Sequence, residues 1–120
     1  MAREAFDLAL AAARINAENR RESEKAAARR LEARKEGERL AALLRKADPH
    51  VVRIWGFGSV FEASRPFRMD SDIDLALEGG DIVALYSIVL DSPFKVDLVD
   101  ITGQEDGFAR AVQSFGMALS

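Results

Sequence analysis

The chain contains no cysteine, a single histidine and no long uninterrupted apolar run. The absence of cysteine excludes a disulfide framework, a thiolate metal site and a thiol nucleophile. No stretch approaches the roughly 18 apolar residues of a membrane span, and the acidic residues close to the N-terminus do not suit a signal peptide. The only histidine, His50, follows Pro49 directly and is interpreted as a structural residue. We therefore expect a soluble cytoplasmic protein with no membrane contact.

The chain also lacks an excess of positive charge, because its formal net charge is −3. Residues 1–50 hold 12 Lys/Arg against 9 Asp/Glu, a balance of +3, and residues 51–120 hold 5 against 11, a balance of −6. The acidic half would repel a phosphodiester backbone unless cations intervene. This argues against direct nucleic-acid binding and favours a metal-dependent site, since carboxylates are the usual ligands of hard divalent cations.

The first part of the chain, residues 1–48, is predicted to be helical. With 120 residues the chain has the length of one domain, and residues 3–47 consist mainly of good helix formers. Asn19-Arg20-Arg21-Glu22 has the spacing of a capping box, which predicts a break into two helices near that point. The apolar stripe is thin between residues 16 and 38, which is typical of a solvated helix or one that waits for a partner. Asp48-Pro49 ends the helical segment.

The second part, residues 49–120, alternates β-branched and aromatic runs with helical patterns. Strands are expected at 51–57, 72–78 and 95–101. Helices are expected at 82–90, with Asp81 as the N-cap, and at 105–118. In the last helix Phe108, Val112 and Phe115 are expected to point inward. These elements predict an α/β (α+β) fold in which a small mixed β-sheet has flanking helices and a long N-terminal helix.

Three aspartates stand at strand positions where a charged side chain is unusual. Side chains alternate along a strand, so Asp72 and Asp74 are expected on one face of the sheet. Asp97 lies inside an apolar strand, where an ionised carboxylate is costly unless it is paired or bound to metal. Three such carboxylates on neighbouring strands could share two Mg²⁺ ions about 3.5–4 Å apart. Asp100 is the alternative third ligand, but its opposite strand parity makes Asp97 the preferred one.

A glycine turn precedes these aspartates in the sequence Gly56-Phe57-Gly58-Ser59. Backbone N–H groups of such a turn and the Ser59 hydroxyl can bind phosphate oxygens. Lys95 is expected to share the face of Asp97 and could reach a phosphate, although a surface role fits it equally well.

In combination, Gly58-Ser59, Asp72-Ile73-Asp74 and Val96-Asp97-Leu98 resemble the signature of the DNA polymerase β-type nucleotidyltransferase superfamily. The short chain resembles the minimal nucleotidyltransferase (MNT) branch, and the resemblance covers roughly residues 51–118. It implies that residues 49–120 form a minimal nucleotidyltransferase domain, in which Gly58 and Ser59 hold the β- and γ-phosphates of ATP. It also implies that Asp72 and Asp74 bind both metals. By the same resemblance, Asp97 binds one metal and helps to activate the attacking hydroxyl.

The chain departs from the family pattern around the turn. The stretch between Ser59 and Asp72 is longer than usual, and Val60-Phe61-Glu62-Ala63 stands where many relatives carry Ala-Arg-Gly. Arg65 and Arg68 are the candidates for the nucleotide-binding cation that this segment lacks. The N-terminal helix is longer than a minimal member needs, so the resemblance implies no role for it.

The resemblance implies that the chain moves AMP from ATP to a hydroxyl, most simply a tyrosine of a partner protein. The partner would be a HEPN-type toxin, with this chain as the antitoxin of a HEPN/MNT toxin–antitoxin pair. Two alternatives stay open: a non-catalytic binding module that neutralises its partner by contact, and nucleotidyl transfer to a small molecule such as an aminoglycoside. The N-terminal helix could pack on its own domain, on the toxin, or on a second copy to form a homo-oligomer.

Overall fold

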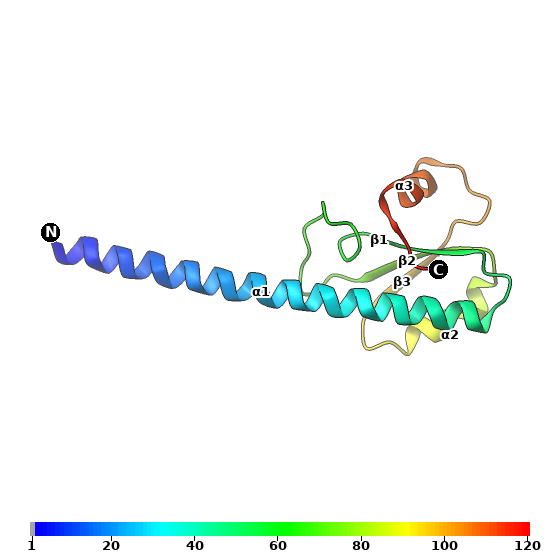
Figure 1. Cartoon of the computed structure of the whole chain (residues 1–120), viewed down its shortest axis with the longest axis horizontal. Coiled ribbons are helices and arrows are strands. Elements are labelled where there is room, and N and C mark those ends of the chain that lie inside the picture. Colours follow the sequence, from blue (N-terminus) through cyan, green and yellow to red (C-terminus); the bar gives the residue numbers. More distant parts are fainter. Residues whose placement is uncertain (1) are drawn as a thin grey trace.

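One uninterrupted helix, α1 (Ala2–Ala47), accounts for most of the length of the molecule (Figure 1). The computed structural model describes residues 2–120, with side chains from residue 4 onward. The 46 residues of α1, at a rise of about 1.5 Å each, match the 71 Å long axis of the molecule. The predicted break at Asn19–Glu22 is therefore wrong. Neither proline nor glycine occurs between Asn19 and Glu22, and the helix formers on both sides favour continuation over a cap.

Four strands form one mixed sheet, which confirms the expected α+β fold. The strands are β1 (Arg53–Phe57), β2 (Ile73–Glu78), β3 (Val96–Asp100) and β4 (Met117–Ala118). Their order is β3-β2-β1-β4. β2 pairs with β1 antiparallel and with β3 parallel, and β4 pairs antiparallel with β1.

Helix α2 (Ile82–Leu90) forms the crossover between the parallel strands β2 and β3. As predicted, Asp81 is its N-cap: the carboxylate accepts hydrogen bonds from the backbone N–H groups of Val83 and Ala84, at 3.1 and 3.4 Å. α1 and α2 lie on one side of the sheet, and α3 (Gly107–Phe115) lies on the other (Figure 1). Within residues 2–120, no helix combines the length and apolar character that crossing a membrane requires.

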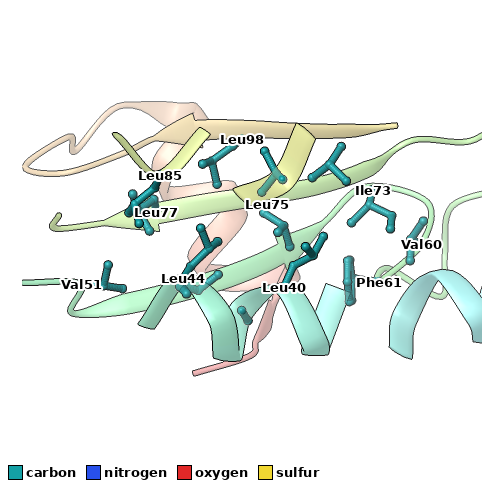
Figure 2. Close-up of a cluster of buried hydrophobic side chains, with 14 of the residues drawn as sticks. Leu40, Leu44, Val51, Val60, Phe61, Ile73, Leu75, Leu77, Leu85 and Leu98 are labelled. Atoms are coloured by element: carbon teal, nitrogen blue, oxygen red, sulfur yellow. The ribbon is translucent and has the colours of Figure 1, made fainter. Parts of the chain in front are cut away.

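The main hydrophobic core lies between the sheet and the C-terminal half of α1 (Figure 2). Leu40 and Leu44 of α1 are fully buried against Ile54 of β1 and against Leu75 and Leu77 of β2. Burial of each such side chain stabilises the fold by about 1.5–3 kcal/mol relative to exposure. The second half of α1 is therefore part of the same core as the sheet.

The opposite face of the sheet carries a smaller cluster under α3. Ala109 and Val112 of α3 pack on Ala76 and Ile101, with Trp55, Phe57 and Val99 partly buried around them. The inward position predicted for Val112 is confirmed. Phe115 is 72% exposed, so the prediction is wrong for this residue. Phe108 is 47% exposed, and its ring contacts Phe57 edge-to-face.

The chain after Phe115 is a strand, and the prediction of helix as far as residue 118 is wrong. The N–H of Gly116 donates to Val112 O and closes α3. A Cβ at Gly116 would lie 2.5 Å from Val112 O and 2.9 Å from Gly56 O. Only glycine therefore lets the chain pass this close to β1, where Met117 and Ala118 gain strand hydrogen bonds.

Candidate functional site

Two of the three predicted aspartates are direct neighbours across the sheet. Asp74 of β2 and Asp97 of β3 are register partners in the parallel pair. Each alternates with residues of the main core, so both side chains point to the α3 side. Asp72 comes two positions before Asp74 and immediately precedes β2. Asp100 is exposed and accepts the N–H of Thr102, and it lies farther along β3 opposite Leu77.

The electrostatics of Asp74 reflect this grouping. Burial is the main cause that raises the pKa of Asp74 to about 6, and the nearby charges of Asp97 and Asp72 raise it further. The Arg65 guanidinium acts in the opposite direction. An acid that is half-buried beside two others therefore retains its proton to a higher pH than an isolated aspartate.

Asp72 and Lys95 form an ion pair at the entrance to β2. The distance between Lys95 Nζ and Asp72 Oδ2 is 3.5 Å, and the lysine is largely exposed. Among the residues described, no three or more Asp, Glu or His side chains are grouped closely enough to hold a metal ion. Asp72 here faces a lysine, and a place in a shared cation site would require this exposed pair to open.

The glycine turn lies directly against the Asp74 side chain. Gly58 has a φ of +74°, a conformation that favours glycine, and a Cβ at this position would overlap Oδ2 of Asp74. Ser59 follows and is partly buried. The structure therefore brings Gly58 and Ser59 to the same end of the sheet as Asp74.

A residue that sequence reasoning did not assign to the site, Glu62, occupies the N–H group of this turn. The Gly58 N–H donates to Glu62 Oε2 at 2.6 Å, and Glu62 Oε1 lies 3.4 Å from Arg65 Nε. The Glu62 side chain is only 10% exposed. One turn of helix-like backbone, in which the N–H of Glu62 donates to Gly58 O, returns the carboxylate to this position. The spacing of an acid four residues after a turn glycine is the signal that would have found it.

Of the two candidate arginines, only Arg65 contacts residues of the candidate site. Arg65 pairs with Glu62 and acts on the pKa of Asp74. Arg68 is exposed, and its backbone N–H donates to Ser71 Oγ within the loop before β2. Arg65 therefore lies with Gly58 and the aspartates in the candidate site, whereas Arg68 lies in the loop before β2.

Helix α1 holds the segment that follows the turn. Val60 O accepts hydrogen bonds from Arg30 Nε at 3.1 Å and from Arg34 Nε at 2.8 Å, and Phe61 O accepts from Arg34 Nη2 at 3.1 Å. The Phe61 ring is buried against Gly37 of α1, where a Cβ would lie 2.5 Å from the ring. The position of Glu62 therefore depends on α1 as well as on the turn.

Comparison of the chain with protein-family models, with curated proteins and with solved structures finds no match.

Proposed function

We propose that the chain is a metal-dependent nucleotidyltransferase that acts as the antitoxin of a HEPN-type toxin. It moves AMP from ATP onto a hydroxyl of that toxin, and the expected acceptor is a tyrosine. The observation that carries the proposal is the in-register pair Asp74 and Asp97, with Asp72 beside it, next to the turn at Gly58. A sheet that served only as a scaffold would gain stability from apolar residues at these positions.

The donor set suits magnesium. Carboxylate oxygens are the ligands that Mg²⁺ prefers in proteins. Burial is the main cause of the raised pKa of Asp74, and the charges of Asp97 and Asp72 add to it, so a cation held between the side chains would offset both costs of ionisation. Asp74 and Asp97 would hold it, with Asp72 joining after release from Lys95. When bound, the metal would neutralise triphosphate charge and polarise the α-phosphate.

The remaining groups have separate tasks in the transfer. The acceptor oxygen forms a bond to the α-phosphorus, the bond from that phosphorus to the bridging oxygen breaks, and pyrophosphate leaves. The Asp97 carboxylate takes the hydroxyl proton. The Gly58 N–H and the Arg65 guanidinium donate to the triphosphate, and both are released for this purpose when Glu62 turns away.

A labelling experiment tests this proposal. The purified chain is incubated with Mg²⁺, ATP labelled at the α-phosphate and the protein encoded by the neighbouring gene. Wild type should label that protein, Asp97→Asn should not, and Asp100→Asn is the matched control because it removes the same charge from the exposed end of the same strand. Equal labelling by wild type and Asp97→Asn would refute the catalytic role of the carboxylates.

One observation favours a second candidate, an antitoxin that neutralises its partner by contact alone. Glu62 occupies the N–H group that a phosphate would need. If the chain inhibits by contact alone, the Asp97→Asn variant should still bind and silence the toxin. Neither wild type nor the variant should then label the toxin. The same samples therefore separate the two candidates when they are also examined for complex formation and toxin activity.

A further inference from the structure

The N-terminal half of α1 projects from the rest of the molecule (Figure 1). Every residue from Glu4 to Lys25 is exposed. A helix in water gains most of its stability from the packing of an apolar face. This part of α1 obtains no such packing from its own chain, although the segment near its N-terminus is rich in apolar residues.

Four of these residues lie on one side of the helix and are here called the tip face: Phe6, Leu10, Ala13 and Ala17. Their spacing of four, three and four residues is that of the contact positions of a coiled coil. Phe6 is 63% exposed and Leu10 is 51% exposed. The tip face thus has the pattern of a helix that packs on another helix.

We propose that the tip face packs antiparallel on the tip face of a second copy of this chain. In this arrangement Phe6 of one copy lies opposite Ala17 of the other, and Leu10 lies opposite Ala13. Each layer then combines a large side chain with a small one, so the two helices keep a constant separation. A parallel pair would place Phe6 on Phe6 and Ala17 on Ala17, and the separation would narrow along the interface.

Charge complementarity supports the same register. Asp7 and Arg14 flank the tip face on one side, because they are seven residues apart and follow Phe6 and Ala13, the equivalent positions of the two four-residue spacings. In an antiparallel pair, flanking residues on this side face their equivalents in the other copy. Asp7 of each copy then lies within reach of Arg14 of the other, and the two-fold symmetry forms this opposite-charge pair twice.

The shape of the molecule allows this pairing. The sheet and the helices α2 and α3 lie at the far end of α1 from the tip face (Figure 1). Antiparallel helices therefore place the two folded bodies at opposite ends of the dimer, and they also align the helix dipoles favourably. The association leaves the carboxylates open, so this inference does not depend on the proposed function.

An adjacent leucine supplies a matched control. Leu8 is 71% exposed and, at helical spacing, lies on the side of α1 away from the tip face. In sedimentation of the full chain, wild type should have twice the mass of the 13.2 kDa protomer. Leu10→Gln should weaken the dimer by at least about tenfold, and Leu8→Gln should leave it unchanged. A monomeric wild type, or equal effects of the two substitutions, would overturn the proposal and leave the tip face for another partner.

Charge exchange tests the antiparallel register. Asp7→Arg alone and Arg14→Asp alone each place like charges opposite one another, so each variant should be at least about tenfold weaker as a dimer. A mixture of the two should form a heterodimer, because both opposite-charge pairs are then restored. All these residues are exposed, so circular dichroism should show folded proteins throughout. A mixture that stays as weak as its components would overturn the register.

Discussion

Replacement of Asp74 by asparagine should stabilise the metal-free protein at neutral pH. The wild-type carboxylate is half-buried beside Asp97 and Asp72, and its pKa is raised to about 6. In the unfolded chain Asp74 ionises near its ordinary value of 3.8. The folded protein therefore binds the proton more tightly, and the stability linked to that proton is lost as the pH rises through about 6.

The magnitude follows from the difference between the two pKa values. A rise from 3.8 to about 6 corresponds to about 3 kcal/mol if the site were shielded from solvent. Since Asp74 is only half-buried, solvent screening reduces the expected gain to about 1.5 kcal/mol. For a chain of this size the gain is a rise in Tm of about 5 °C at about pH 7.5.

Urea unfolding of wild type and Asp74→Asn in the presence of a chelator measures this difference. It should be largest above about pH 7 and should vanish below about pH 4, where the carboxyl is protonated in both states. Addition of Mg²⁺ should stabilise wild type and not the variant, so that the gap closes. Asp70→Asn is the control, because Asp70 is exposed in the preceding loop. A variant that is less stable than wild type above pH 7 would refute the argument that burial and the neighbouring carboxylates destabilise the ionised form of Asp74.

Gly58→Ala should destabilise the fold by about 1–3 kcal/mol, because the turn has positive φ and the new methyl group overlaps Asp74 Oδ2; chemical denaturation measures the loss, and an unchanged midpoint would contradict it. Leu40→Ala should cost about 2–5 kcal/mol, because the side chain is fully buried in the main core; the control is Leu43→Ala, whose side chain is 39% exposed and which should cost clearly less. Glu62→Ala should tighten binding of Mg²⁺–ATP by about tenfold, because the substitution frees the Gly58 N–H and the Arg65 guanidinium. Titration calorimetry measures the affinity, and weaker binding would mean that Glu62 supports the nucleotide site instead of blocking it.

Errors in the expected helices have local physical causes. The capping-box spacing at Asn19–Glu22 is present, but a cap forms only where the preceding residue leaves the helix, and nothing in the flanking sequence forces it to do so. Near the C-terminus the apolar spacing of Val112 and Phe115 suits a helix, yet the helix ends at Phe115. The close approach of Gly116 to β1 and the strand hydrogen bonds of Met117 decide this, and neither can be seen in a local window.

The candidate site was predictable where it depends on strand periodicity. Alternation along β3 predicts that Asp97 and Asp100 point to opposite sides of the sheet, and the register of β3 with β2 agrees. The contacts of Glu62 with Gly58 and of Lys95 with Asp72 were not predictable, because each depends on how a loop is held against the sheet. For Glu62, two arginines of α1 that lie 30 and 26 residues before Val60 hold that loop.

The sequence by itself determined the types and order of the main elements, the N-cap at Asp81 and the opposite sides of Asp97 and Asp100. These features follow from helix propensity, capping and strand alternation, which act between residues a few positions apart. Only the tertiary structure decided that β4 completes the sheet, that Glu62 occupies the Gly58 N–H, and that α1 packs along one half of its length. These outcomes depend on which distant surfaces meet, because the free energy of burial and of long-range hydrogen bonds is set by the packed elements together.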